Sequence, residues 1–464
     1  MVSMPQLASL DFGVSYTAVD ACRVLLPELP PANAPGIHRV LYQRARALGP
    51  KTKTKTVFLD ECAADFPDVV LAMERVGWNF STLDLSLCDS TGLFNRPECV
   101  LKLIMQHSPP LTSLKITSLD SRIIGSEAVL RGVAGMCRTF SALTLLQLRN
   151  QQFSPNGCQN LAEALFTMNN LRHLDLSNNQ LTPSDLNALL RGRSSLTALH
   201  LDRVLETYGQ GLAGGKDWLE INEDAPELVQ LSWTLAQQTN LQVLSLMDGT
   251  VVSPAATNAI ASALCALPSI RRLHLCPMAF SNSICQKLLS KAIAAMPSLE
   301  SLDVPDRSVP MWDVFHEALD TAGGLSCLHT LRMTGVLWRG AAEGPIKDVE
   351  SSRCLARTVT SMPALRFLEL VRWNLTDAAL LWEHLVVHSA DTGNLREVSL
   401  NSCKIGNVKA ASALAGAVGR MCSLRTFSAN FHDLSCRDMN QFKGLLPASV
   451  NADLGNGNYY PVGA

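Results

Sequence analysis

One pattern of apolar residues recurs twelve times along this chain, and it constrains the fold more than any other feature. Its clearest copy runs from Leu171 to Leu181 and reads L-x-x-L-x-L-x-x-N-x-L. The frames begin at Phe80, Leu111, Leu143, Leu171, Leu196, Leu241, Ile270, Leu299, Leu328, Leu365, Leu395 and Leu424. Self-similarity at a short period predicts a stack of like units, each packed against its neighbours.

Each frame predicts a short strand. Its fourth and sixth residues are apolar and alternate with polar ones, which indicates a strand with one buried face. We therefore expect the third, fifth and seventh residues to point away from the core. The four frames from Leu241 to Leu328 follow one another at three intervals of 29 residues. This period predicts about twelve parallel strands on a concave face, with helices on the convex face.

A helix is expected after each strand. The tenth place after the frame start is often apolar, and Ser or Thr often follows it as a predicted N-cap. These predicted caps are Ser154, Thr182, Ser281, Thr376 and Ser435. After Ser154, residues Leu161, Leu165 and Met168 recur at helical spacing.

The 28–29-residue period and the segment 153–165, with its L-T/S-x-x-G-C-x-x-L-A-x-A-L pattern, resemble the ribonuclease-inhibitor-type leucine-rich repeats. The resemblance covers roughly residues 57–446 and implies an α/β leucine-rich-repeat solenoid, a horseshoe of about 12 repeats. The ninth residue of such a frame is usually Asn or Cys. Here the ninth residues include Cys88, Asn179 and Cys403, but also Met278, Arg307 and Trp373. Several turns are therefore expected to satisfy their backbone groups in other ways.

The domain organisation follows from where the frames begin and end. We expect a repeat array over residues 57–454, after an N-terminal segment 1–56 that is partly helical or disordered, and before a tail at 455–464. Residues 57–59 and 450–454 are predicted as first and closing strands. Two repeats are long, with insertions near 203–224 and 338–352. Insertions of this kind lie in surface loops and often carry function.

Composition excludes several partner classes. The net charge is −2, with Lys+Arg 39 against Asp+Glu 41, so no electrostatic argument favours nucleic acid or a membrane surface. The 14 cysteines contain no C-x-x-C pair, which favours a reducing compartment over a disulfide framework or a zinc site. The first residues lack a basic and apolar leader, so we expect a cytoplasmic protein. Leaderless secretion into a host cell is the alternative.

No catalytic, cofactor or metal site is predicted. Residues 209–214 read G-x-G-x-x-G, but the nearest predicted strand ends about eight residues earlier, so we interpret them as a loop. The set His173, Asp175, His200 and Asp202 projects from neighbouring predicted strands. It could bind a metal in principle, but a solvated polar surface produces such neighbours by chance.

The candidate binding surface is a row of fifth residues. They are His274, Asp303, Arg332 and Glu369, of alternating sign on four successive predicted strands. Arg272, Phe367 and Arg372 flank the row, with Phe367 expected as an exposed apolar anchor, and Trp218 in the first insertion is a further candidate contact. Two interpretations stay open: a partner-binding surface, or a ladder of charges that satisfy one another.

The predicted function is that of a non-enzymatic protein–protein interaction module. It would act as an adaptor, sensor or inhibitor and bind a protein of unknown identity through the concave face and loops. One alternative is a secreted bacterial effector acting on a host protein. Another is a ubiquitin-ligase substrate-recognition component, because residues 25–29 are faintly similar to the start of an F-box. The sequence predicts no oligomeric state.

Overall fold

A computed structural model gives the structure of the chain. It describes residues 9–11, 56–60, 80–87, 97–107, 110–118, 127–204, 226–246, 254–275, 283–306, 325–335 and 355–454, with single-residue or two-residue gaps at 152, 180, 356, 360, 374, 377, 407, 432–433 and 435. The chain divides into two compact units, unit 1 (Met1–Tyr208) and unit 2 (Gly209–Ala464).

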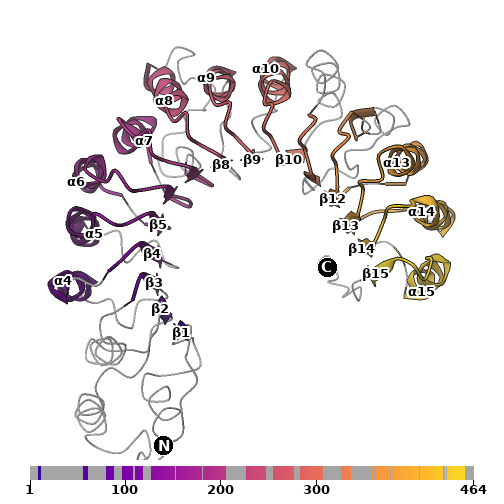
Figure 1. The fold of residues 1–464 in the computed structure, drawn as a ribbon, viewed down its shortest axis with the longest axis horizontal. Coiled ribbons are helices and arrows are strands. Elements are labelled where there is room, and N and C mark those ends of the chain that lie inside the picture. Colours follow the sequence, from indigo (N-terminus) through magenta and orange to yellow (C-terminus); the bar gives the residue numbers. More distant parts are fainter. Residues whose placement is uncertain are drawn as a thin grey trace, which may run out of the picture. The chain divides into compact units, whose positions relative to one another are not determined.

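In the described part of unit 1, seven parallel strands hydrogen-bond to one another in chain order. They are β1 (Ser9–Asp11), β2 (Thr56–Asp60), β3 (Thr82–Leu87), β4 (Ser113–Ser118), β5 (Leu145–Arg149), β6 (His173–Asp175) and β7 (Ala198–His200). The helices α4 (Pro97–His107), α5 (Glu127–Thr139), α6 (Pro155–Phe166) and α7 (Pro183–Leu190) cover one side of the strands (Figure 1). We call the uncovered side the open face.

Unit 2 repeats this arrangement, with eight parallel strands among its described residues. They are β8 (Val243–Ser245), β9 (Arg272–His274), β10 (Ser301–Asp306), β11 (Thr330–Gly335), β12 (Phe367–Val371), β13 (Glu397–Cys403), β14 (Thr426–Phe431) and β15 (Asn451–Leu454). The helices are α8 (Pro226–Ala236), α9 (Pro254–Cys265), α10 (Ser283–Ala294), α13 (Ala379–Thr392), α14 (Val408–Arg420) and α15 (Cys436–Leu445).

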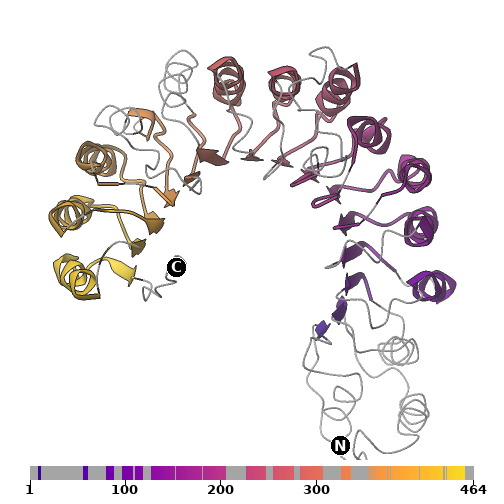
Figure 2. The ribbon, with the colours of Figure 1, turned by 180° about the vertical axis from the view of Figure 1, so that it is seen from behind.

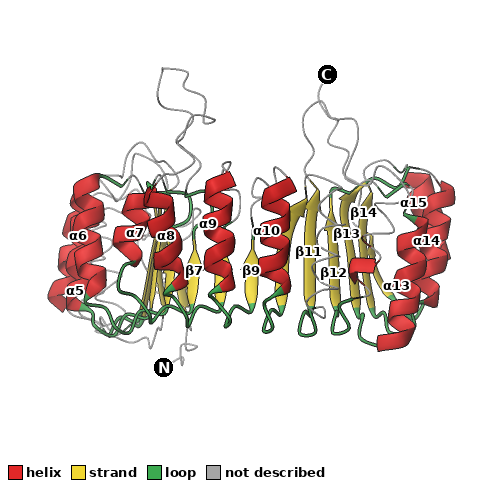
Figure 3. Cartoon of the chain, turned by 90° about the horizontal axis from the view of Figure 1, so that it is seen from above, coloured by secondary structure: helices red, strands yellow, loops and turns green. Residues whose placement is uncertain are grey.

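In each unit the strands lie on the inner side of the curve and the helices on the outer side, as both views show (Figure 1 and Figure 2). From above, the helices form a layer over one face of the strands (Figure 3). The predicted arrangement of parallel strands and helices on opposite faces is therefore confirmed within each unit. Among the described residues, none of the helices combines the length and the apolar character needed to cross a membrane.

The fourth residue of every frame is fully buried, as the period-two alternation predicts. These residues are Leu83, Leu114, Leu146, Leu174, Leu199, Leu244, Leu273, Leu302, Leu331, Leu368, Val398 and Phe427. Within each unit they stand opposite one another in register, for example Leu302 with Leu331 and Leu331 with Leu368. Burying each side chain contributes about 1.5–3 kcal/mol, so this stripe forms the core between strands and helices.

Two predicted helix caps are confirmed in unit 1. The Ser154 hydroxyl accepts a hydrogen bond from the Gly157 backbone N–H at 3.0 Å and caps α6. Thr182 caps α7 in a capping box with Asp185. Gly157 also lets α6 approach α5, because a side chain there would collide with Leu130. Close packing of α6 against α5 therefore explains why the helix pattern has glycine at this position.

The predicted cap at Thr376 is wrong. Helix α13 begins at Ala379, and its N-cap is Ala378, which makes no side-chain cap bond. Thr376 instead lies against the next repeat: a Cβ atom on Gly406 would come within 2.6 Å of its side chain. Contact with the neighbouring turn therefore prevails over local capping at this position. Ser281 and Ser435 lie outside the described residues.

In the turn after a strand, a side-chain donor can bond a backbone carbonyl oxygen of the preceding repeat. Three different types of ninth residue supply this donor. Asn179 Nδ2, Trp373 Nε1 and Cys403 Sγ each donate to a carbonyl oxygen of the preceding repeat, at 2.6, 3.0 and 3.3 Å. The acceptors are the sixth residues Leu148, Met333 and Leu370 respectively. The indole of Trp373 therefore takes the place of the asparagine amide at one turn. This agrees with the expectation that turns without Asn or Cys satisfy their backbone groups in other ways. The ninth residues Cys88, Met278 and Arg307 lie outside the described residues.

The ends of the array extend beyond the twelve frames. Strand β2 includes the predicted strand at 57–59, and β15 confirms the closing strand. Strand β1 pairs with β2 through Ser9 to Asp11, which no sequence pattern indicated. Of the first predicted insertion, the structure describes Arg203 and Val204, and Val204 is fully buried. The insertion near 338–352 and the tail lie outside the described residues.

Candidate functional site

The predicted row of fifth residues exists in unit 2. In register, Asp303 on β10 stands opposite His274 on β9 and Arg332 on β11, and Arg332 stands opposite Glu369 on β12. The four side chains lie on the open face because the flanking fourth and sixth residues point into the core. We call His274, Asp303, Arg332 and Glu369 the unit-2 row.

The unit-2 row is paired internally. Asp303 Oδ2 lies 3.6 Å from His274 Nδ1 and 3.8 Å from Arg332 Nη1. Arg332 Nε lies 3.0 Å from Glu369 Oε2, and Glu369 Oε1 accepts a hydrogen bond from Asn401 Nδ2 at 2.8 Å. A chain of polar contacts therefore runs from β9 to β13. Neighbouring charges therefore neutralise one another within this row. Together the same side chains form one continuous polar surface across these strands.

Burial differs strongly along the unit-2 row. The carboxylate of Asp303 is only 5% exposed and that of Glu369 13%, whereas the Arg332 side chain is 49% exposed. Asp303 Oδ1 has no hydrogen-bond partner among the described residues. A buried acceptor without a donor costs about 1–3 kcal/mol. Arg332 is therefore the most exposed of these three side chains, and Asp303 is buried beside it with one oxygen unsatisfied.

The flanking candidates are placed unevenly. Arg272 on β9 is exposed on the open face beside the row. Phe367 lies between Thr330 and Glu397 in register and is only partly exposed, so the expectation of an exposed anchor is corrected. Arg372 follows the end of β12 with a left-handed backbone, φ 60°. Trp218 lies outside the described residues.

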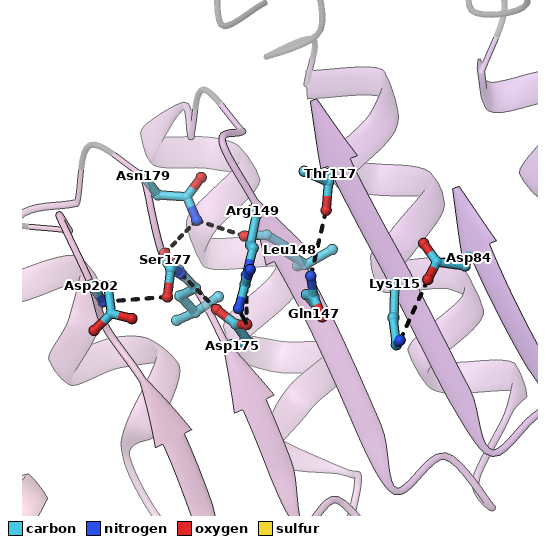
Figure 4. A network of polar contacts seen from close by, with 11 residues as sticks. Asp84, Lys115, Thr117, Gln147, Leu148, Arg149, Asp175, Ser177, Asn179 and Asp202 are labelled. Atoms are coloured by element: carbon cyan, nitrogen blue, oxygen red, sulfur yellow. Dashed lines mark hydrogen bonds and ion pairs between the residues drawn. The ribbon is translucent and has the colours of Figure 1, made fainter. Parts of the chain in front are cut away.

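A second polar row lies in unit 1, of which only Asp175 and His200 were named from the sequence. Its fifth residues stand in register as Asp84, Lys115, Gln147, Asp175 and His200. Lys115 Nζ lies 3.4 Å from Asp84 Oδ2, and Gln147 Nε2 donates to Thr117 Oγ1 at 3.5 Å (Figure 4). The same frame position that predicted the unit-2 row could have predicted this one.

Asp175 is the most constrained acid of the unit-1 row. It is 7% exposed, and its Oδ2 receives both Arg149 Nε and Arg149 Nη2 at 2.7 Å (Figure 4). Its Oδ1 accepts the backbone N–H of Ser177 at 3.0 Å. Asp175 therefore orients an arginine and a turn. Among the described residues, no group of three His, Cys, Asp or Glu side chains is arranged to hold a metal ion.

Two buried thiols, Cys137 and Cys158, have raised pKa values. Burial raises the pKa of Cys137 to about 12. Burial, and then the nearby Asp185, raises the pKa of Cys158 to about 12. Burial lowers the pKa of Arg193 to about 10, and this group still carries its charge at neutral pH. Both thiols therefore stay protonated at neutral pH and behave as small apolar core groups, as expected for Cys158.

The class of fold is defined by three features: the repeating frames, the parallel strands in register and the helices on one side of those strands. The chain is an α/β leucine-rich-repeat solenoid. No protein-family model matches the sequence. The human NACHT, LRR and PYD domains-containing protein 5 is 32% identical over 163 residues, which are 33% of this chain and 13% of that relative. The chain thus matches only a small part of the relative's length.

Two solved structures are similar to the chain. One is in the crystal structure of the Rad7 and Elc1 complex in yeast, with TM-score 0.44 and 13% identity, over 93% of this chain and 90% of that one. The other is the leucine-rich repeat-containing protein LegL7 from Legionella pneumophila. It has TM-score 0.37 and 15% identity, over 80% of this chain and 91% of that one.

Proposed function

We propose that the chain is a ribonuclease-inhibitor-type leucine-rich-repeat protein that binds another protein through the open face of unit 2. It would act without catalysis, as an adaptor, sensor or inhibitor. The contact surface comprises the unit-2 row with Arg272, Phe367 and Arg372, and Trp218 in the insertion is a secondary contact. A reducing compartment belongs to the same proposal and is supported by the free buried thiols Cys137, Cys158 and Cys403.

The observation that carries the proposal is the unit-2 row with its half-exposed arginine. Arg332 is held between two largely buried carboxylates, at 3.8 and 3.0 Å, so its fork is oriented before any partner arrives. Pre-oriented side chains lose less freedom on binding. Arg and aromatic residues dominate the energetics of protein interfaces, and Phe367 lies on the neighbouring strand β12.

Affinity capture with mass spectrometry tests the proposal. The bait is the full chain, and the variant combines Arg332→Glu with Phe367→Ala. Reversing one charge and removing one ring at the centre of the surface is expected to weaken capture of a true partner by about 100-fold. Arg332→Glu places a third carboxylate beside Asp303 and Glu369 and should lower the melting temperature, so circular dichroism at the assay temperature first establishes that the variant is folded.

Unit 1 offers a matched control. Lys115→Glu with Leu145→Ala makes the same changes at the fifth residue of one strand and the third residue of the next. A partner that is retained by this control and lost by the unit-2 variant supports the proposal. If the folded unit-2 variant captures the same proteins as the unaltered chain, the interface lies elsewhere.

A further inference from the structure

A second surface of unit 2 lies where strands β12, β13 and β14 begin. We propose that Arg366, Arg396 and Arg425, called here the arginine row, bind an acidic peptide segment of a protein partner. These are the second residues of three successive frames. The inference goes beyond the proposed function, which uses the fifth residues of the frames.

Backbone hydrogen bonds place the three arginines side by side. The Arg396 N–H donates to the Arg366 carbonyl oxygen at 2.8 Å, and the Arg425 N–H donates to the Arg396 carbonyl oxygen at 2.8 Å. Adjacent strands are about 4.8 Å apart, so the three Cα atoms span roughly 10 Å. The array itself therefore fixes their spacing.

The arginine row has no acidic counterpart within the part of unit 2 that is described. All three side chains are exposed, and none forms an ion pair or a side-chain hydrogen bond with a described residue. Glu397, the next residue along β13, makes no ion pair with a described residue either. Like charges directly opposite one another on neighbouring strands destabilise a sheet. An acidic ligand would remove this repulsion.

Two exposed arginines elsewhere in unit 2 do have an acidic partner. Arg271 and Glu300 are the second residues of two earlier, successive frames. Arg271 Nη1 lies 2.9 Å from Glu300 Oε1. Arg420 on α14 lies 2.6 Å from Glu383 on α13. Arg272 on β9, Arg372 after β12 and Arg437 on α15 also lack a side-chain partner among the described residues, but they lie singly. The arginine row differs because its three members occupy consecutive repeats and are joined through backbone hydrogen bonds.

The same position in unit 1 is occupied differently. Thr112 Oγ1 donates to the Ser81 carbonyl oxygen at 3.1 Å, and Thr144 Oγ1 donates to the Thr112 carbonyl oxygen at 3.1 Å. Thr197 Oγ1 donates to the Arg172 carbonyl oxygen at 3.2 Å, and Arg172 Nη1 itself donates to the Asn169 carbonyl oxygen at 2.9 Å. These side chains are used by the backbone of their own array. In the arginine row the charged groups are left for another molecule.

The chemistry of the arginine row favours carboxylates on a protein. Guanidinium groups match carboxylates through two parallel hydrogen bonds. An extended segment of about four residues spans roughly 10 Å, the length of the arginine row. Nucleic-acid interfaces need a much larger basic surface than three arginines, and the whole chain carries a net charge of −2.

Fluorescence anisotropy with a fluorescein-labelled hexaglutamate peptide tests the proposal on the full chain. The variant carries Arg366→Gln, Arg396→Gln and Arg425→Gln. Three lost charge pairs at an exposed site should weaken binding about tenfold. Binding to the unaltered chain should also weaken as salt is raised from about 0.05 to 0.3 M, because exposed charges are screened. The single variant Arg396→Gln should lose about twofold and is the readout if the triple variant unfolds.

The control removes the same charge from elsewhere in unit 2. Lys287→Gln and Lys291→Gln on α10 with Arg437→Gln on α15 alter exposed residues, and peptide affinity should stay within about twofold. Equal losses in control and variant would mean that only net charge matters and would overturn the proposal. So would unchanged binding by the folded variant. If hexathymidylate bound more tightly than hexaglutamate through the same three arginines, the ligand of the arginine row would be a nucleic acid, and the proposal would be overturned.

Discussion

The two units meet one backbone requirement with different side chains. In unit 1, Asn179 closes its turn with a small amide that makes three hydrogen bonds. In unit 2, Trp373 closes the corresponding turn with one hydrogen bond, from Nε1 to the Met333 carbonyl oxygen, and fills the space with a ring that is 1% exposed. The comparison teaches that the repeat fixes which carbonyl needs a donor, while the residue decides whether bonding or packing stabilises the turn.

The open faces differ in a similar way. In unit 1, Arg149 binds Asp175 closely, and Gln147 interrupts the charges between Lys115 and Asp175. In unit 2, the charges run without interruption from His274 to Glu369. Charge is therefore used locally in unit 1 and forms a continuous, partly exposed surface in unit 2.

The largest expected effect is at the tryptophan turn. Trp373→Ala removes a fully buried ring and should lower the free energy of unfolding by about 3–5 kcal/mol. Trp373→Phe keeps most of the ring and removes only the donor, so it should cost about 1–2 kcal/mol. Urea denaturation followed by circular dichroism measures both. Equal losses would show that the hydrogen bond, and not packing, stabilises this turn.

The asparagine turn should respond through its hydrogen bonds. Asn179→Ala leaves the Gln151 N–H and the carbonyl oxygens of Leu148 and Leu176 without their side-chain partner. We expect a loss of about 2–3 kcal/mol, although little volume is removed. Asn179→Asp keeps the acceptor for the Gln151 N–H but sets a carboxylate oxygen against the two carbonyl oxygens that Nδ2 served. At a site that is 1% exposed, it should cost at least as much as Asn179→Ala. If Asn179→Ala lowered the free energy of unfolding by less than about 0.5 kcal/mol, hydrogen bonds would not be what stabilises the asparagine turn.

The two open-face arginines should differ by a smaller amount. Arg149→Met leaves the largely buried Asp175 with only the Ser177 N–H, so we expect a loss of about 1–2 kcal/mol. Arg332→Met removes contacts of 3.8 and 3.0 Å, longer than the 2.7 Å contacts of Arg149. It leaves Asp303 beside His274 and Glu369 bonded to Asn401, so about 0–1 kcal/mol is expected. Arg138→Met, in an exposed pair with Glu163, is the control and should change little. The reverse order would mean that unit 2 carries the more tightly held charges.

The smallest expected effect is a dependence on mild acid that arises in unit 2. Burial lowers the pKa of His388 on α13, against the opposing effect of Asp391. The unfolded chain therefore binds a proton more readily, and stability present above about pH 6.5 falls as the pH drops below it. His388→Leu should remove this part of the acid sensitivity. Urea midpoints between pH 7.5 and 5.5 test it, and identical slopes for variant and unaltered chain would refute it.

The sequence predicted most of the fold because the array is a sum of local rules. Alternating Leu residues determined which side of each strand is buried, and frame alignment determined the register that places Asp303 between His274 and Arg332. Strand β1 could not be predicted, since three residues far from the repeats carry no period and pair only through contact with β2.

The candidate site was predicted as a set of positions and not as a set of contacts. Frame position gave the unit-2 row, but a period places Cα atoms and leaves side-chain distances open. Whether Asp303 is buried with an unpaired oxygen, and whether Arg332 bonds Glu369, depends on rotamers and neighbours. For the same reason Thr376 packs on Gly406 where local sequence predicts a cap.

By itself, then, the sequence determined the class of fold, the buried stripe and the row of fifth residues, because these follow from hydrophobic period and chain connectivity. The tertiary structure alone decided which charges are neutralised within the array and which stay free, as in Arg149 against Arg366, Arg396 and Arg425. The physical reason is that hydrophobic burial is additive along a repeat, whereas an ion pair requires two particular side chains to come within about 4 Å.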